Sequence, residues 1–279
     1  MSSFMKGIFV ALVALLAAEM PAQKANVIFL HHSTGGMIYE GGNVADSVAA
    51  YNQREGTEYT IKDWNFPYKP YEWANYPYDY WNIWINGYCE DYRGEKGYVN
   101  VMCLDDLSAR YDVVIFKHCF PGADILEDTG NPDISSVRKS LENYKLQYRA
   151  LRDAFASFPE TQFVVWTLAP RHRLYPGTTE HAGRAGAFVD WVKSEWLQEE
   201  GKRYENIHVF DYFSLSATLD PEADPPAVQH CLKYKYEKEH DHHDSHPNEL
   251  ACKEIGPEFY RFIRDLLESE FGKDPQRNK

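Results

Sequence analysis

The sequence has no surplus of positive charge, and this absence argues against one broad class of function. The 279 residues include 42 acidic side chains but only 29 lysines and arginines, for a formal net charge of -13 at pH 7. A chain of this charge is not expected to offer a basic face for nonspecific binding to nucleic acid. Internal repeats and linkers are also absent, so one large domain is the simplest organisation.

Cysteine is scarce, and its spacing excludes two kinds of site. The chain has five cysteines and no C-x-x-C pattern, so nothing supports a zinc knuckle or a thioredoxin-type centre. Five cysteines suit an oxidising compartment, where the odd number leaves at least one without a partner in the chain. The nearest neighbours in sequence are Cys89 with Cys103 and Cys231 with Cys252, although the sequence leaves the connectivity open. We interpret Cys119 as a small buried residue.

A long apolar run is missing as well. The run from Gly7 to Ala18 is too short to span a membrane comfortably. Lys6 precedes it, and small residues and Pro21 follow, which is the order of a secretory signal peptide. No nearby cysteine supports a lipid anchor, and a retained membrane anchor is the alternative. We predict a signal peptide over residues 1–25 of a secreted or periplasmic protein, cleaved after Ala18, Ala22 or Ala25.

Apolar runs and amphipathic segments alternate along the rest of the chain, which is typical of βαβ units on a parallel sheet. We therefore predict a single doubly wound, flavodoxin-like α/β domain over residues 26–272, with helices on both faces, an aromatic-rich insertion and a polar tail at 273–279. The predicted strands are Val27–Leu30, Val113–Phe116, Phe163–Leu168 and Ile207–Phe210. The predicted helices are Ser135–Phe158, Ala182–Glu200 and Pro257–Phe271, the last with its proline near the first turn.

Reactive side chains follow the predicted strands, where sites form in sheets of this kind. Ser33 stands after the first strand in "HHSTGG", and His246 stands before the last helix in "DSHPN". A serine hydroxyl becomes a nucleophile when a histidine, oriented by a carboxylate, takes its proton. Gly35 and Gly36 would let backbone N–H groups point at the oxyanion that forms. These residues predict a serine hydrolase that requires no metal or organic cofactor.

The two blocks and their order resemble the SGNH (GDSL-type) hydrolase superfamily over most of the mature chain. In that family the nucleophile follows the first strand, and the base lies in a C-terminal Asp-x-x-His-Pro block. The resemblance implies Ser33 as nucleophile and His246 as base. The aspartate is expected three residues before the histidine, where this chain has His243, so Asp244 is our preferred carboxylate and Asp241 lies further away.

In that family an asparagine block supplies an oxyanion donor, and in this chain it would fall in "FKHCFPGAD". That stretch lacks an asparagine. Lys117, His118 or a backbone N–H are the substitutes we consider, together with the amide of Asn82. Arg171 and its neighbour Arg173 follow a strand, and they either clamp an acidic group of the substrate or belong to a solvated loop.

Aromatic residues are abundant, with 20 Tyr, 15 Phe and 7 Trp. They are densest from Trp64 to Trp84, and this segment either stacks sugar rings or packs a small core of its own. The part from Tyr78 to Asn82, including Trp81, is the part we expect near the site.

The function predicted from these features is an exported esterase that removes acyl groups, such as O-acetyl groups, from a small-molecule or polysaccharide ester. Neither nucleic acid nor stable membrane insertion after signal removal is expected. One alternative is a catalytically inactive carbohydrate-binding protein on the same fold. The other is a metal-dependent enzyme that uses the histidine cluster His240, His242, His243 and His246 with Asp241 and Asp244.

Overall fold

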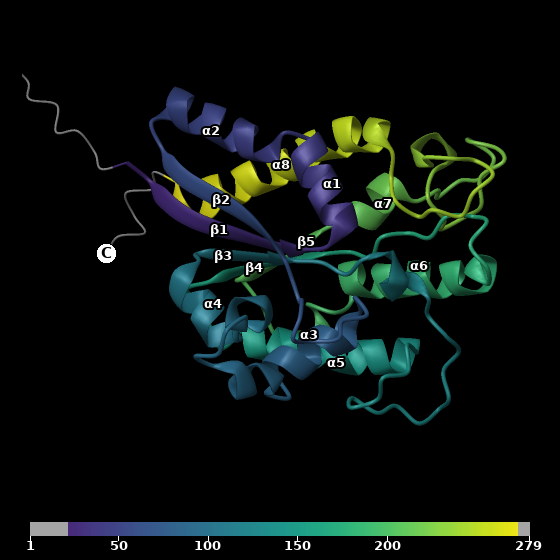
Figure 1. Ribbon diagram of the computed structural model, residues 1–279, viewed down its shortest axis with the longest axis horizontal. Coiled ribbons are helices and arrows are strands. Elements are labelled where there is room, and N and C mark those ends of the chain that lie inside the picture. The colour runs from purple at the N-terminus through teal and green to yellow at the C-terminus, as the bar shows by residue number, and fades with distance from the viewer. Residues whose placement is uncertain (1–21, 273–279) are drawn as a thin grey trace, which may run out of the picture.

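A single parallel sheet organises the molecule (Figure 1). A computed structural model describes residues 22–272, so most of the predicted signal peptide and the tail at 273–279 lie outside the described residues. The strands are ordered β2-β1-β3-β4-β5, and every pair is parallel. This order is the flavodoxin-like one, and it confirms the predicted fold class. The strands are β1 Lys24–His31, β2 Glu58–Asn65, β3 Val113–Phe116, β4 Gln162–Trp166 and β5 Ile207–Phe210.

The four predicted strands are present, and the prediction missed β2. This strand lies at the edge of the sheet, and Tyr59 is its one buried residue. Its sequence EYTIKDWN therefore has no continuous apolar run, which was the signal used for the other four strands. Because β1 begins at Lys24, cleavage of a signal peptide after Ala25 would remove two residues of this strand.

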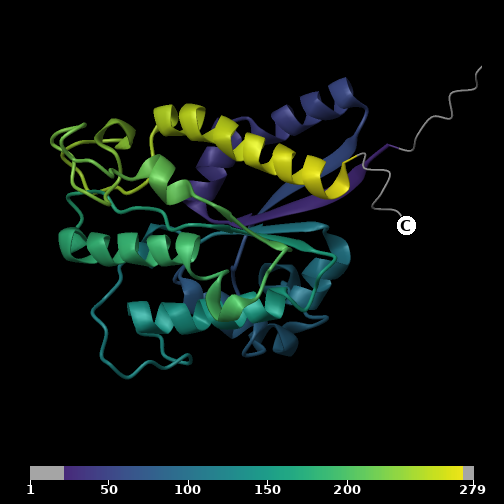
Figure 2. The ribbon, with the colours of Figure 1, turned by 180° about the vertical axis from the view of Figure 1, so that it is seen from behind.

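Helices cover both faces of the sheet, because successive residues of each strand point to opposite sides. Ile28 and Leu30 of β1 pack under α3, α4, α5 and α6, whereas Val27 and Phe29 pack under α1, α2 and α8 (Figure 2). The helices are α1 Ser33–Gly41, α2 Val44–Glu55, α3 Pro77–Trp84, α4 Leu104–Arg110, α5 Leu141–Phe155, α6 Thr178–Ser194, α7 Tyr212–Ser216 and α8 Glu249–Phe271.

The predicted bounds of the last helix were wrong. Helix α8 begins at Glu249, so Pro257 lies inside it rather than in its first turn. Asn248 is the N-cap, and its side chain accepts a hydrogen bond of 3.1 Å from the Ala251 N–H. The predicted helices at 135–158 and 182–200 are also displaced, since α5 and α6 are Leu141–Phe155 and Thr178–Ser194.

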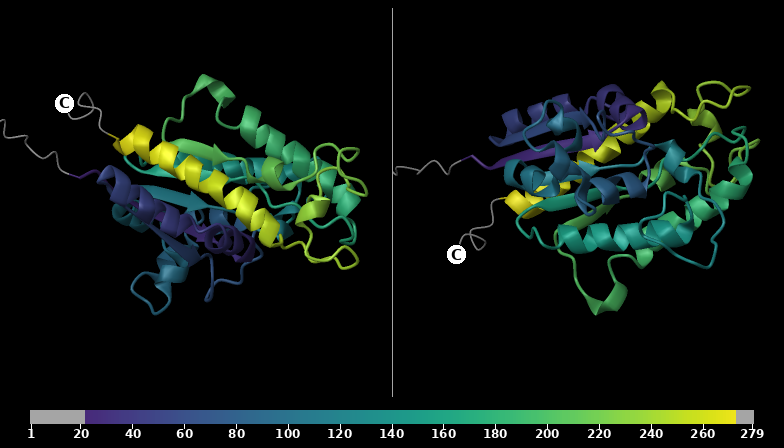
Figure 3. Two further views of the ribbon diagram at one scale, coloured as in Figure 1. Left: turned by 90° about the horizontal axis from the view of Figure 1, so that it is seen from above. Right: turned by 60° about the horizontal axis from the view of Figure 1, so that its bottom comes forward.

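Helices α1 and α8 touch through glycine, and this contact places the site. A Cβ atom at Gly256 would lie 2.3 Å from Cα of Gly42, so no side chain fits at either position. The two helices consequently lie side by side over one face of the sheet (Figure 3). Ser33 is the first residue of α1, and the segment that carries His246 leads directly into α8.

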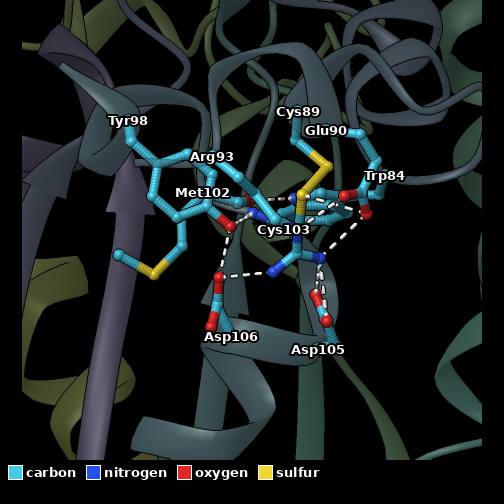
Figure 4. A network of polar contacts seen from close by, with 9 residues as sticks. All are labelled: Trp84, Cys89, Glu90, Arg93, Tyr98, Met102, Cys103, Asp105 and Asp106. Carbon is cyan, nitrogen blue, oxygen red and sulfur yellow. Dashed lines mark hydrogen bonds and ion pairs between the residues drawn. A yellow bond between two sulfur atoms is a disulfide. The ribbon is translucent and has the colours of Figure 1, made fainter. Parts of the chain in front are cut away.

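The segment between β2 and β3 is the predicted aromatic-rich insertion. It contains α3 and α4 with the short helical turns Tyr88–Tyr92 and Tyr98–Val101 between them. A disulfide joins Cys89 to Cys103 in this segment (Figure 4). The other nearest-neighbour pair does not form, because Cys231 and Cys252 are free and buried, as is Cys119.

Many aromatic residues of the insertion are buried in the main core rather than in a separate core of their own. Phe66, Tyr76, Tyr80 and Trp84 belong to the cluster that covers one face of the sheet. Of the helices in residues 22–272, none is both long and apolar enough to cross a membrane.

Candidate active site

Ser33, His246 and Asp244 form a continuous hydrogen-bonded chain. Nε2 of His246 lies 2.8 Å from Oγ of Ser33, and Nδ1 of the same ring lies 2.6 Å from Oδ1 of Asp244. Asp244 also accepts the backbone N–H of His246 at 3.0 Å, so its carboxylate holds both the ring and the main chain of the histidine. This is the geometry of a nucleophile, a base and an orienting carboxylate.

The fold explains why these residues meet. Ser33 follows β1, and β1 is paired with β3, so the serine stands where the strand order reverses. His32, the N-cap of α1, has extended backbone angles, and the helix starts immediately after it. The loop between α7 and α8 gathers at this same end of the sheet and brings His246 over Ser33 (Figure 1).

Asp244, two residues before the base, is the carboxylate that contacts it. Burial alone would raise the pKa of Asp244, but its bonds to His246 and the charge of Lys238 outweigh burial, so the pKa lies below its ordinary value. Nζ of Lys238 lies 3.6 Å from Oδ2 of Asp244. His243, which stands at the family's position, stacks against His242 instead.

Gly35 and Gly36 do not offer free N–H groups to an oxyanion. Both donate to the carbonyl of His32, at 2.8 and 3.3 Å, as members of the first turn of α1. Gly35 is instead required for packing, because a Cβ there would lie 2.6 Å from Cδ of Lys117. The two glycines therefore do not act as oxyanion donors, as expected from the sequence, but allow neighbouring side chains to pack closely against α1.

Lys117 and His118 lie beneath the site rather than in it, contrary to their expected role. Both side chains are fully buried. Nζ of Lys117 points to Sγ of Cys119 at 3.3 Å, and the ring of His118 packs against Tyr80 with no hydrogen bond to either nitrogen among the described residues. Burial, with a smaller effect of the Lys117 charge, lowers the pKa of His118 to about 3, so the imidazole is neutral.

Trp81, Asn82 and Arg171 are engaged within the protein. Nδ2 of Asn82 donates to the Tyr71 hydroxyl at 3.3 Å, and Trp81 is buried against Tyr78. The Arg171 guanidinium is paired with Asp124, with Nε at 2.6 Å from Oδ1, and so does not present a free clamp for an acidic substrate.

Arg171 nevertheless helps to build a pocket beside the triad. Its guanidinium lies over the rings of Phe120 and Tyr175, at 4.9 and 3.8 Å from their centroids. Phe120 also meets the His246 ring edge-on at 4.8 Å. The pocket has a volume of about 500 Å³, and its lining consists of Phe120, Arg171, Tyr175, Glu239, His242, His243, Asp244 and Ser245.

Asn75 is a residue that the sequence reasoning missed. It is 1% exposed, has a φ of 61°, and neither amide atom has a hydrogen-bond partner among the described residues. Its carbonyl would lie 2.9 Å from a Cβ on Gly122, in the loop that also carries Cys119. A left-handed non-glycine residue with an unpaired buried amide is costly, and such costs concentrate at functional sites. The one feature of the sequence that could have pointed to Asn75 is its position within the dense aromatic segment from Trp64 to Trp84.

Asp79 holds the segment around Asn75. Its Oδ2 accepts the backbone N–H groups of Ala74 and Asn75, at 2.9 and 2.6 Å. Burial raises the pKa of Asp79 to about 6, although these hydrogen bonds oppose the rise. Trp73, in the same segment, stacks on the ring of His32, the residue before Ser33, at 3.9 Å, and 38% of its surface is exposed.

The histidine cluster does not converge on one point. Nδ1 of His240 lies 2.9 Å from Glu237, whereas His246 is bonded to Ser33 and Asp244. In the part of the chain that the structure describes, three metal-ligating side chains come together at Cys89, Glu90 and Cys103, and two of these are joined in the disulfide.

No family model matches the chain, and no curated protein matches it in sequence. The chain is similar to several solved structures, and two of them are enzymes with the following likeness. One is a gut microbial diltiazem-metabolizing enzyme, with 10% identity and a TM-score of 0.48 over 87% of this chain. This chain covers 47% of that protein, about half of its length. The other is a carbohydrate esterase, with 11% identity and a TM-score of 0.37 over 88% of this chain and 70% of its own.

Proposed function

We propose that the protein is an exported serine esterase of the SGNH type. The observation that carries this proposal is the chain of contacts from Ser33 Oγ through His246 to Asp244. In the proposed reaction Ser33 attacks the ester carbonyl while His246 accepts the hydroxyl proton at Nε2. Asp244 stabilises the imidazolium, which returns the proton to the leaving alcohol, and water then repeats the cycle on the acyl-enzyme.

The oxyanion is assigned in this proposal to the Asn75 amide and to the positive end of the α1 dipole. Gly35 and Gly36 donate to the His32 carbonyl, so the helix contributes through its dipole rather than through their N–H groups. The Asn75 amide is supported by its unpaired state and by its neighbours: Trp73 stacks on His32, and Gly122 lies against the Asn75 carbonyl. A preformed donor in a water-poor site is the arrangement that stabilises such charge most strongly.

The proposed substrate is an acylated carbohydrate. Trp73 supports this class, because a partly exposed indole stacked on His32, the residue before Ser33, offers a flat surface to the apolar face of a sugar ring. The Cys89–Cys103 disulfide supports the export part of the proposal, since disulfides persist in oxidising compartments.

The central test is labelling by a fluorophosphonate, followed by intact-mass measurement. We expect one adduct on the wild type and none on Ser33→Ala. Labelling of His246→Ala should be slower by about 10³-fold or more. Ser47→Ala, at a half-buried serine of α2 bonded to the Asn43 carbonyl, serves as the control and should label like the wild type. A folded wild type without an adduct would contradict the proposal and favour the inactive carbohydrate-binding alternative.

The substrate class is tested separately with Trp73→Ala. We expect kcat/KM for an O-acetylated oligosaccharide to fall about fivefold, the equivalent of about 1 kcal/mol of stacking. Turnover of p-nitrophenyl acetate, which has no sugar ring, should change little. Trp64→Ala removes an equally exposed tryptophan from β2 and is the matched control. Equal losses on both substrates would argue against a sugar platform.

A further inference from the structure

Lys117 is a fully buried lysine whose side chain ends at a sulfur atom. It follows β3, and Tyr80 donates a hydrogen bond of 2.7 Å to its carbonyl, which fixes the backbone there. Its side chain runs beneath α1, where Gly35 leaves room for it. Nζ reaches Sγ of Cys119 at 3.3 Å. Buried lysines are rare without a carboxylate partner, so an apolar residue would be the cheaper occupant of this position.

Cys119 links this lysine to the first turn of α1. Its Sγ lies 3.6 Å from Oγ1 of Thr34 and 3.7 Å from Oγ of Ser33. Burial raises the pKa of the Cys119 thiol, but Lys117 and the donors of Thr34 and Ser33 outweigh it, so the pKa lies below its ordinary value. Burial lowers the pKa of Lys117, and the neighbouring Cys119 opposes this effect.

We propose that Lys117 and Cys119 form a buried positioning pair that holds the Ser33 hydroxyl in line with His246. The sulfur contacts Ser33 Oγ from within the protein, and His246 Nε2 meets the same oxygen at 2.8 Å from the other side of the site. Lys117 fixes the sulfur, and the two contacts together select one rotamer of the serine. This inference rests on the proposed serine nucleophile and adds two residues that act through it.

The consequence is kinetic. A serine that samples other rotamers spends less time in the attacking geometry, and small displacements of a reacting atom reduce rates by large factors. Loss of the pair should therefore lower the rate of bond formation at Ser33 while leaving the affinity for the reagent unchanged, because neither Lys117 nor Cys119 is exposed to it.

The experiment measures kinact and KI for fluorophosphonate labelling of Lys117→Met, Cys119→Ala, Cys119→Ser and the Lys117→Met/Cys119→Ala double variant. We expect kinact to fall about tenfold to a hundredfold in the two non-polar single variants, with KI within about twofold of wild type. The double variant should be no slower than the slower single variant, because the residues act as a unit. Cys119→Ser keeps a polar atom next to Ser33 and should recover part of the loss.

The controls are Lys233→Met and Cys231→Ser. Lys233 is a half-buried lysine that donates to the Leu215 carbonyl, and Cys231 is a free buried cysteine elsewhere in the fold. Both should label like wild type. A wild-type kinact in folded Lys117→Met or Cys119→Ala would overturn the inference. If Lys117→Met fails to fold, the pair of Cys119 variants decides: equal kinact in Cys119→Ala and Cys119→Ser would overturn it as well. A wild type that is not labelled at Ser33 would instead overturn the proposed function on which the inference rests.

Discussion

Two groups of polar residues in this protein differ in their exposure to water and in the number of their polar partners. Around Arg93, in the insertion, the guanidinium contacts Glu90, Asp105 and Asp106, so partners are plentiful (Figure 4). These side chains are 30 to 58% exposed. Beneath the reactive end of the sheet, Asn75 and His118 are at most 1% exposed and have no hydrogen-bond partner among the described residues.

The difference teaches where polar groups are costly. Ion pairs in water are screened and contribute little, even when several surround one arginine. A buried polar atom without a partner loses its hydrogen bonds to water and gains no hydrogen bond within the protein. Substitutions in the Arg93 cluster should therefore cost little stability. The reactive end of the sheet contains buried polar groups that lower stability, which is the pattern expected where function constrains the residues.

Among the changes that test this contrast between the two groups, the largest effect is expected from Asn75→Gly. Glycine adopts a φ of 61° without strain, so this change removes the amide and preserves the backbone. If Asn75 donates to the oxyanion, kcat for an ester substrate should fall about 10²-fold with little change in thermal stability. Asn43→Gly is the matched control, because Asn43 also has a left-handed backbone, with a φ of 52°, but is exposed at the start of α2. Equal activity of the two variants would contradict a role for the Asn75 amide.

An intermediate effect, on stability rather than activity, is expected from His118→Phe. The pKa of His118 is about 3 in the folded protein and near 6.5 in the unfolded chain. Below pH 6.5 the unfolded chain therefore takes up a proton that the folded protein refuses, and stability falls as the pH falls. His118 alone should account for about 2 kcal/mol of this loss between pH 7 and pH 5.

The phenylalanine variant should lack that part of the pH dependence. Its ring is compatible with the contacts to Tyr80, Phe116 and Tyr148, and it has no orphaned nitrogens. Urea unfolding followed by tryptophan fluorescence at pH 7 and pH 5 measures the difference. A variant whose unfolding free energy falls by the same amount as that of wild type would show that His118 is not buried in its neutral form.

The smallest effect is expected from Arg93→Ala. This change removes every ion pair of the cluster around Arg93, but the partners are exposed to water, so the melting temperature should fall by no more than about 3 °C. Differential scanning calorimetry at low and high salt tests this. A fall of 10 °C or more in the melting temperature would contradict the claim that these exposed ion pairs contribute little to stability.

Much of the fold could be predicted because it depends on local pattern. The apolar runs at Val113–Phe116 and Ile207–Phe210 are strands β3 and β5, and their bounds agree with the structure. Strand β2 was missed because it buries Tyr59 alone and so lacks that pattern. The start of α8 was misplaced because Pro257, a residue that usually marks a helix start, is tolerated inside a helix that packs along its length.

At the candidate site the sequence by itself determined the residue types and their order. Ser33 after a strand and His246 before a helix were identifiable because each lies in a short distinctive block. The tertiary structure alone decided which carboxylate meets His246, which cysteines pair, and that Gly35 and Gly36 serve packing. It also decided that Cys119, with Lys117 behind it, lies against the nucleophile, whereas Asn82 is bonded to Tyr71. These outcomes depend on contacts between residues far apart in the chain, whose geometry is set by the packing of whole helices and strands rather than by any local pattern.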